Sequence, residues 1–92
     1  MNKIAFITGG SRGIGKAISE RFAKEGYTLI FNYKENTLKA EELKTELENK
    51  YNAEVFTIKA DLSDEKAIVD MVETIISKYG KIDVLVNNAG IV

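Results

Sequence analysis

The sequence predicts an α/β fold in which a doubly wound parallel sheet of four strands, in spatial order 3-2-1-4, packs against three helices. Two observations lead to this prediction. Short apolar segments alternate with longer amphipathic ones along the chain, which is typical of parallel strands joined by right-handed crossover helices. The 92 residues also contain no proline, no linker-like stretch and no internal repeat, so residues 1–92 are expected to form one unit.

The expected strands follow the apolar segments. Residues 3–8 are nearly continuously apolar, and residues 82–86 are apolar on both faces apart from Asp83, as in strands that are covered from both sides. Residues 28–32 are rich in strand-forming side chains, and residues 54–59 alternate in polarity. Three helices cannot cover both faces of four strands, so part of the sheet is expected to lack a cover.

The amphipathic segments predict three helices, each with apolar residues at helical spacing. The first follows the glycines and is expected to pack through Ile14, Ala17, Ile18 and Phe22. The second runs from about Asn36 and is expected to pack through Leu38, Leu43, Leu47 and Tyr51. The third is expected to pack through Ile68, Met71, Val72, Ile75, Ile76 and Tyr79.

Capping residues set the expected ends of two of these helices. Gly26 and Gly80 stand where a residue in the left-handed conformation closes a helix. Ser63 is expected to cap the start of the third helix, with Asp64 and Glu65 in the first turn, where the helix dipole favours negative charge.

Composition excludes several functional classes. A formal net charge of −1 creates no broad field that would attract nucleic acid or an anionic membrane. The absence of cysteine and histidine rules out disulfides, thiolate or imidazole metal ligands and a Ser-His-Asp triad, so no metal site is expected. No segment approaches the roughly 20 apolar residues of a membrane span, and no signal peptide is evident. A cytoplasmic protein is expected.

The most informative segment lies between the first strand and the first helix, where residues 8–15 read Thr-Gly-Gly-Ser-Arg-Gly-Ile-Gly. Glycines there permit a tight turn and a close approach of the main chain to a ligand. The free amides and the dipole of the following helix attract a diphosphate. Ligands also bind at the carboxyl ends of the strands in open α/β sheets. Dinucleotide binding is therefore predicted, the alternative being a glycine-rich turn that only joins strand to helix.

Two other phosphate-binding motifs fit this segment less well. The nucleoside triphosphatase loop, G-x-x-x-x-G-K-[ST], is matched from Gly10 to Lys16, but Ala17 stands where a magnesium-binding hydroxyl is needed. The G-x-G-x-x-G dinucleotide fingerprint fails as well, because the glycines here follow a different spacing.

The observed spacing resembles the T-G-x-x-x-G-x-G motif of the short-chain dehydrogenase/reductase family. Two further motifs agree: residues 87–90 match the family's N-N-A-G, and Asp61-Leu62 resembles its adenine-contacting pair. The resemblance covers all 92 residues and is closest in texture to the 3-oxoacyl-[acyl-carrier-protein] reductase branch. It implies a Rossmann-type fold, of which this chain would be the dinucleotide-binding portion without the catalytic portion.

The resemblance implies cofactor-binding residues at the ends of three strands. Around the phosphates it places Gly9, Ser11, Arg12, Gly13, Ile14 and Gly15. Asp61 would accept a hydrogen bond from the adenine amino group, and Leu62 would offer its amide to the ring. Along the adenosine ribose it places Asn88, Ala89 and Gly90, while Asn87 would tie the fourth strand to its neighbour. Two alternatives stay open, namely that Asp61 is a carboxylate leading the third helix and that the Asn-Asn pair is a simple turn.

The choice of cofactor is expected to depend on the end of the second strand, where NAD-specific folds place a carboxylate for the ribose 2′-hydroxyl. Tyr33 occupies that position here, so no charge would repel a 2′-phosphate, and Lys34 with Arg12 would neutralise one. NADP(H) is therefore predicted over NAD(H). Glu35 opposes this prediction because it could turn toward the ribose, and Lys34 could alternatively be a solvated loop charge.

Catalytic residues of the family are missing from the chain. The resemblance implies a tyrosine with a lysine four residues later, as general acid and its partner. The residues four beyond the tyrosines are Phe31, Thr37, Val55 and Asp83, so no Tyr-x-x-x-Lys exists and no catalytic residue is assigned.

Three functional hypotheses follow. The chain is part of an NADPH-dependent carbonyl reductase, a non-catalytic nucleotide-binding module, or an assembly piece whose uncovered sheet pairs with another chain. Full-length relatives are expected to be homo-oligomers. Substrate-binding elements of the family would lie beyond residue 92.

Overall fold

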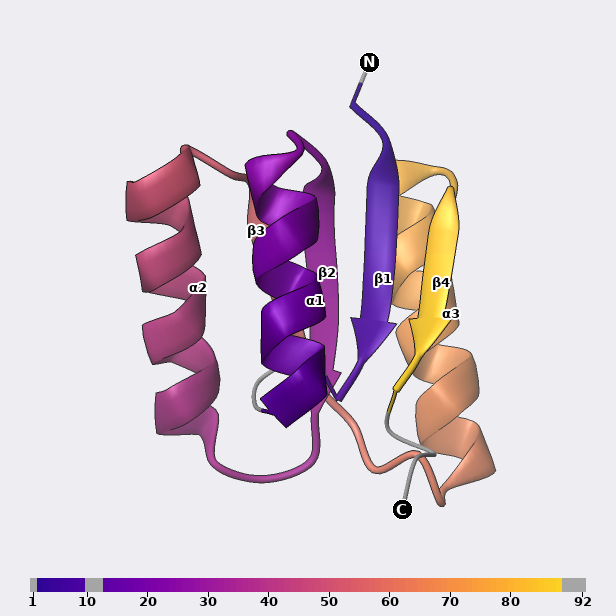
Figure 1. Cartoon of the computed structure of the whole chain (residues 1–92). Coiled ribbons are helices and arrows are strands. Elements are labelled where there is room, and N and C mark those ends of the chain that lie inside the picture. Colours follow the sequence, from indigo (N-terminus) through magenta and orange to yellow (C-terminus); the bar gives the residue numbers. More distant parts are fainter. Residues whose placement is uncertain (1, 10–12, 89–92) are drawn as a thin grey trace.

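Figure 1 shows the computed structural model of the chain, which describes residues 2–9 and 13–88. Strands and helices alternate throughout this part of the chain, as predicted. The elements are β1 (Ile4–Thr8), α1 (Gly13–Lys24), β2 (Thr28–Tyr33), α2 (Thr37–Tyr51), β3 (Val55–Lys59), α3 (Glu65–Tyr79) and β4 (Val84–Asn87).

The four strands form one parallel sheet in the order β3-β2-β1-β4, which confirms the predicted topology. In its register, Ala5 of β1 lies between Leu29 of β2 and Val84 of β4. Because all strands run in the same direction, their carboxyl ends gather at one edge of the sheet, at the bottom of Figure 1.

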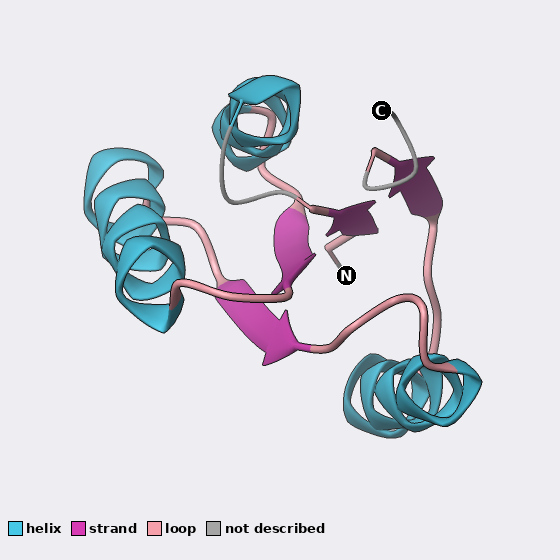
Figure 2. Cartoon of the chain, turned by 90° about the horizontal axis from the view of Figure 1, so that it is seen from below, coloured by secondary structure: helices cyan, strands magenta, loops and turns pink. Residues whose placement is uncertain are grey.

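The sheet separates two apolar cores. Figure 2, which looks along the strands, shows α1 and α2 on one side of the sheet and α3 on the other. The first core lies under α1 and α2 and is built on Ala5, Ile7, Leu29 and Phe31. The second lies under α3 and is built on Ile4, Phe6 and Ile30, with Met71 and Ile75 of the helix. Side chains of β1 and β2 alternate between the two cores, as the pleat of a strand requires.

Each of the helices α1, α2 and α3 uses a narrower packing face than its apolar spacing predicts. In α1 the buried residues are Gly15, Ser19 and Ala23, whereas Ile14 is 65% exposed and Ala17 is also exposed. Ile18 and Phe22 are only partly buried, at the edge of this face. Small residues at the centre of the contact let the helix axis approach the sheet, which leaves the larger side chains at the margin.

None of the helices in residues 2–9 and 13–88 combines the length and apolarity needed to cross a membrane.

The second and third helices show the same correction. In α2 the buried residues are Ala40, Leu43 and Leu47, and Leu38 is exposed. In α3 burial is confined to Met71 and Ile75, while Val72 and Ile76 are exposed. Helix α3 is the single helix on its side of the sheet within the described residues, so a narrow stripe of it is buried.

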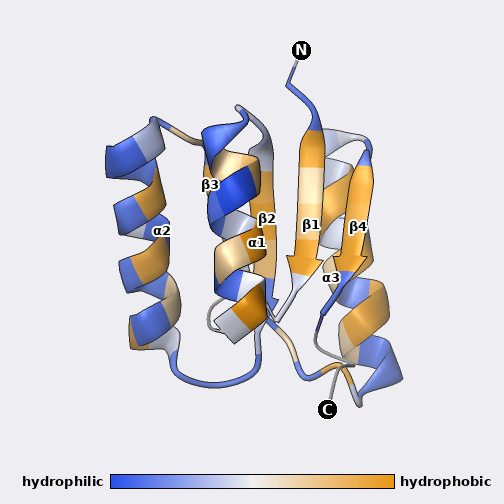
Figure 3. Cartoon of the chain, in the orientation of Figure 1, coloured by the Kyte–Doolittle hydropathy of each residue, from blue (hydrophilic) through white to orange (hydrophobic). Residues whose placement is uncertain are grey.

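Strand β4 is not covered on both faces, contrary to the prediction for residues 82–86. Val84 and Val86 pack against the core under α1 and α2, but Leu85 is 61% exposed. Leu85 lies opposite Phe6 in the register, and thus on the α3 side of the sheet. Figure 3 colours β4 as strongly hydrophobic. This strand therefore has an apolar side chain, that of Leu85, on an exposed face. The expected shortage of helical cover falls on this strand.

The cap of α3 also differs from the prediction. Asp64, not Ser63, is the N-cap residue, and its side chain accepts hydrogen bonds from the amides of Lys66 and Ala67. The two closing glycines behave as predicted, since Gly26 and Gly80 both have positive φ, the conformation that favours glycine.

Asp83 fastens the beginning of β4 to the beginning of β1. Its Oδ2 accepts a hydrogen bond of 2.7 Å from the amide of Ile4, and its own amide donates to the Ile4 carbonyl oxygen at 2.9 Å. Lys81 lies 3.2 Å from the same carboxylate. The Ile4 hydrogen bond, with a smaller contribution from Lys81, holds the pKa of Asp83 below its ordinary value.

The lowered pKa of Asp83 predicts that this contact is lost in acid. A carboxyl group whose pKa is lower in the folded than in the unfolded state stabilises the fold above the unfolded pKa, and this stabilisation disappears as the pH falls through the folded pKa. We expect the free energy of unfolding, measured with urea between pH 7 and pH 3, to fall less steeply in Asp83→Asn than in the unmodified chain. Asp70→Asn, at an exposed position of α3, is the matched control and should retain the original slope. Identical slopes for Asp83→Asn and the unmodified chain would contradict this assignment.

Candidate functional site

A cleft of about 890 Å³ opens at the carboxyl ends of the strands. Its walls are the ends of β1 and β4, the connection from β2 to α2, and the connection from β3 to α3. The lining residues described by the structure are Gly9, Gly13, Ile14, Asn32, Tyr33, Lys34, Glu35, Asn36, Lys39, Ala60, Asp61, Leu62, Ser63 and Asn88.

The glycine-rich turn forms the part of the cleft next to α1. Gly9 and Gly13 have φ values of 64° and 61°, which a side chain with a Cβ adopts only with strain. A Cβ added to Gly13 would meet no other atom within 4 Å, so the backbone conformation is what requires glycine there. The first turn of α1 contains no acidic residue, and its positive dipole end is therefore not neutralised by a side chain of that turn.

Asn32, at the end of β2, holds the glycine turn in place. Its Oδ1 accepts a hydrogen bond of 2.7 Å from the amide of Gly9, and its Nδ2 donates to the carbonyl oxygen of Ala60 at 3.2 Å. Asn32 is 2% exposed, so these bonds lie in a region of low dielectric, where they are strong and where their loss is costly. One buried amide therefore links the ends of β1, β2 and β3.

The end of β4 is tied to the same turn from the other side. Nδ2 of Asn88 donates to the carbonyl oxygen of Gly9 at 3.1 Å, and the Asn88 amide donates to Oγ1 of Thr8 at 2.9 Å. The Thr8 hydroxyl lies 3.3 Å from Oδ1 of Asn87. Asn87 thus links β4 to β1, as predicted, and the Asn88 side chain holds the Gly9 carbonyl, while the Asn88 amide also donates to the Val86 carbonyl oxygen at 3.1 Å.

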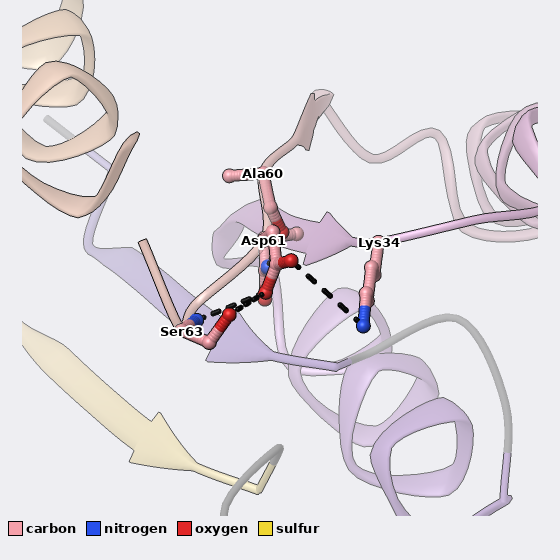
Figure 4. Close-up of polar contacts among 5 residues, drawn as sticks. Lys34, Ala60, Asp61 and Ser63 are labelled. Carbon is pink, nitrogen blue, oxygen red and sulfur yellow. Dashed lines mark hydrogen bonds and ion pairs between the residues drawn. The ribbon is translucent and has the colours of Figure 1, made fainter. Parts of the chain in front are cut away.

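A charged pair joins two walls of the cleft. Nζ of Lys34, after β2, lies 3.8 Å from Oδ2 of Asp61, after β3, as Figure 4 shows. Oδ1 of Asp61 accepts two hydrogen bonds from Ser63, from its amide at 2.9 Å and from its hydroxyl at 2.8 Å. These bonds, and to a smaller extent Lys34, hold the pKa of Asp61 below its ordinary value. The carboxylate is therefore charged at neutral pH.

At the end of β2, Tyr33 occupies the position where NAD-specific folds carry a carboxylate. Tyr33 is buried against the core under α1 and α2 while also lining the cleft. The next residues, Lys34 and Glu35, are exposed. Asn36 then adopts a left-handed conformation and caps α2 by accepting a hydrogen bond from the Lys39 amide. As a result Lys39 also lines the cleft, on the same wall as Lys34.

The structure brings most of the predicted site residues together. Eight of them line this one cleft, namely Gly9, Gly13, Ile14, Tyr33, Lys34, Asp61, Leu62 and Asn88. Gly15 is instead buried in the packing face of α1. The remaining predicted residues, Ser11, Arg12, Ala89 and Gly90, lie outside the described residues.

Three residues of the cleft have roles that the sequence analysis missed. Asn32 is a polar residue within an otherwise apolar strand, which is a signal that could have been noticed, because a buried amide requires partners. Ser63 was assigned to a helix cap but orients Asp61. Lys39 gave no signal, since one lysine among many on an amphipathic helix is ordinary.

The cleft combines polar groups of both charges with apolar walls. Lys34 and Lys39 supply two ammonium groups, Glu35 and Asp61 two carboxylates, and Leu62 and Ile14 apolar surface, beside the N-terminus of α1. A helix N-terminus with nearby ammonium groups suits a phosphate, and the apolar surface suits a base. Within the described residues, no group of three histidine, cysteine, aspartate or glutamate side chains could hold a metal ion.

Comparisons with known proteins relate the sequence to one family. The sequence profile of the family described as short chain dehydrogenase matches residues 3–92. The chain is 43% identical, over 91 residues, to the 3-oxoacyl-[acyl-carrier-protein] reductase FabG of Staphylococcus epidermidis, covering 99% of this chain and 37% of that protein. It is also 43% identical, over 91 residues, to the short-chain dehydrogenase/reductase homolog YusS of Bacillus subtilis, of which it covers 83%.

Solved structures give the same relationship. The L-sorbose reductase from Gluconobacter frateurii, solved in complex with NADPH and L-sorbose, superposes with a TM-score of 0.90 at 37% identity, over 97% of this chain and 34% of that chain. A short-chain dehydrogenase/reductase from Serratia marcescens superposes with a TM-score of 0.88 at 41% identity, over 94% of this chain and 35% of that chain. The chain thus spans little more than a third of the length of the FabG reductase and of these two enzymes.

Because the side-chain amide of Asn32 is buried and makes two hydrogen bonds, we expect its removal to lower the stability of the fold markedly. Asn32→Leu keeps the approximate volume but leaves the Gly9 amide and the Ala60 carbonyl without their partner. We expect the free energy of unfolding to fall by about 1–3 kcal/mol, measured by urea denaturation. Asn49→Leu, at an exposed position of α2, is the control and should change stability by less than about 0.5 kcal/mol. Equal effects of the two substitutions would show that the amide of Asn32 is not structurally important.

Proposed function

Because the chain belongs to the short-chain dehydrogenase family, we propose that residues 1–92 form the dinucleotide-binding part of an NADP(H)-dependent reductase. The observation that carries the proposal is the cleft at the carboxyl ends of β1, β2, β3 and β4, which Gly9 and Gly13 of the glycine motif line. This is the edge at which open α/β sheets bind their ligands.

The glycine turn would hold the pyrophosphate. Gly13 leaves open space beside its backbone, and the first turn of α1 has no acidic residue that would repel a phosphate. Main-chain amides in such a turn bind an anion without the penalty of moving a side chain. By family resemblance Ser11 and Arg12 complete this cradle, with Gly9 supplying backbone freedom and Ile14 an additional amide, while Gly15 lets α1 pack closely on the sheet.

The adenosine would lie between the connections that follow β2 and β3. Asp61 would accept a hydrogen bond from the adenine amino group, and the Leu62 amide would donate to the ring. Asn88, with Ala89 and Gly90, would lie along the ribose. The position of Asn88 supports this assignment, because its side-chain amide is fixed by the Gly9 carbonyl oxygen at the floor of the cleft.

NADP(H) is proposed over NAD(H). A ribose 2′-hydroxyl is held by a carboxylate in NAD-specific folds, and Tyr33 stands in its place. Lys34 lines the cleft one residue later and, with Arg12, would neutralise a 2′-phosphate. The similarity to the Gluconobacter frateurii L-sorbose reductase, which was solved in complex with NADPH, supports this choice.

The proposed reaction is hydride transfer from the cofactor to a carbonyl group, with a 3-oxoacyl thioester as the substrate suggested by the similarity to the FabG reductase. The cofactor supplies the hydride, and a protein acid must protonate the oxygen. No Tyr-x-x-x-Lys pair is present in residues 1–92. We therefore propose that this chain binds the cofactor and requires the catalytic portion of a longer reductase for turnover.

A second candidate is a non-catalytic module that binds NADP(H). The similarity to the YusS homolog favours it, because the chain covers 83% of that protein and such a relative has little room for a catalytic portion. Turnover distinguishes the candidates: a module would bind NADPH without reducing a carbonyl in any natural context, whereas a reductase part would gain activity with its catalytic portion.

Calorimetric titration of the folded chain tests the proposal. We expect NADPH to bind, NADH to bind more weakly, and no NADPH to be oxidised when a 3-oxoacyl thioester is added. Equal affinities, or tighter binding of NADH, would overturn the cofactor preference. No heat with either dinucleotide, from protein shown to be folded by circular dichroism, would overturn the function itself.

The glycine turn can be tested with a matched pair of substitutions. Gly13→Ala and Gly26→Ala both place a Cβ at a positive φ, and neither Cβ meets another atom within 4 Å. Both should lower the free energy of unfolding by about 1 kcal/mol. Only Gly13→Ala should weaken NADPH binding, by about tenfold or more, because Gly13 lines the cleft and its Cβ would occupy space that the pyrophosphate is proposed to fill. Equal affinities of the two variants would place the phosphates elsewhere.

A further inference from the structure

Asp61 faces Lys34 across the cleft, and this pairing has a consequence for the selectivity of the site. Resting on the proposed function, we propose that Asp61 restrains the preference for a 2′-phosphate by holding the ammonium group that would bind it. Asp61 is thereby a specificity-determining residue, in addition to any contact that it makes with adenine.

Asp61 is held by more contacts than Lys34. Two hydrogen bonds from Ser63 orient Asp61 through Oδ1, which leaves Oδ2 directed at Lys34. Figure 4 shows the lysine reaching toward this carboxylate from the other wall. The Lys34 side chain is 65% exposed and is the longer and more flexible partner. A new anion on its side of the cleft would therefore move the lysine, not the aspartate.

The ammonium group has two competing partners once a 2′-phosphate arrives. Tyr33 contributes no charge there, so Lys34 is the cation that follows the strand most directly. Its attraction to Asp61 at 3.8 Å must be weakened before it can approach a phosphate closely. The negative charge of Asp61 also repels the phosphate. Both effects lower the affinity for a 2′-phosphorylated ligand and leave a ligand without that group unaffected.

Two nucleotide fragments isolate this effect. The compounds 2′,5′-ADP and 5′-AMP share the adenine, ribose and 5′-phosphate and differ in the 2′-phosphate alone. Any contact of Asp61 with adenine therefore changes both affinities equally and cancels from their ratio. Asp61→Asn keeps an Oδ1 that can accept from Ser63 while removing the charge, so the turn should persist, which circular dichroism can verify.

The experiment is a double-mutant cycle in the ratio of the affinities for 2′,5′-ADP and 5′-AMP. We expect Asp61→Asn to raise this ratio about two- to fivefold, the scale of an exposed ion pair, and Lys34→Gln to lower it. In the Lys34→Gln background, Asp61→Asn should raise the ratio by a smaller factor, because only the direct repulsion of the phosphate by Asp61 is left to remove. Glu35→Gln is the matched control: it removes a carboxylate from the same cleft and should change the ratio less than Asp61→Asn does.

Several results would overturn the inference. An unchanged ratio in Asp61→Asn would show that the pair does not restrain the lysine. An equal rise in the Lys34→Gln background, or with Glu35→Gln, would show a general effect of charge in place of competition for Lys34. If the unmodified chain binds both fragments and one of these results follows, the inference alone fails. If it binds neither fragment, the proposed function fails together with it.

Discussion

The buried side chain of Asn32 is the constraint on which the arrangement of the site depends. It stands at the end of β2 and bonds the amide of Gly9 on one side and the carbonyl of Ala60 on the other. A buried amide without partners is costly, so the three chain segments stay together wherever the sheet is formed. The left-handed conformation of Gly9 and the position of the β3–α3 connection both follow from this arrangement. Asn88 completes it from β4 by bonding the carbonyl of Gly9.

Much of the fold could be predicted because alternating apolar segments allow few arrangements. The strand order, the helix count and the closing glycines agree with the prediction. The packing faces of the helices agreed less well. Helical spacing identifies which residues could share a face, but the approach distance of the helix to the sheet decides which of them are buried. In α1 the buried residues are the small Gly15, Ser19 and Ala23, and the prediction that Ile14 packs in the core is wrong.

The part of the candidate site that carries a sequence motif could be predicted. The part that depends on contacts between distant segments could not. Glycines and asparagines at strand ends identified the edge of the sheet and eight residues of its cleft. The partners of Asn32 could not be predicted, because they depend on the register of three strands that are 23 to 28 residues apart in sequence. For the same reason the pairing of Lys34 with Asp61 was not foreseen, although each residue was singled out separately.

The links from Asn32 and Asn88 to Gly9 have a thermodynamic consequence. Gly9 is held by Asn32 of β2 and by Asn88, which follows β4, and Asn32 in turn holds Ala60, which follows β3. We therefore expect Gly9 to keep its position only while the four strands are paired. Ligand occupancy and global unfolding are therefore linked equilibria. A ligand at 100 times its dissociation constant would add about 2.7 kcal/mol to the stability of the folded state. In a chain of this size, where the total is of the order of 5–15 kcal/mol, occupancy would determine much of its resistance to proteolysis.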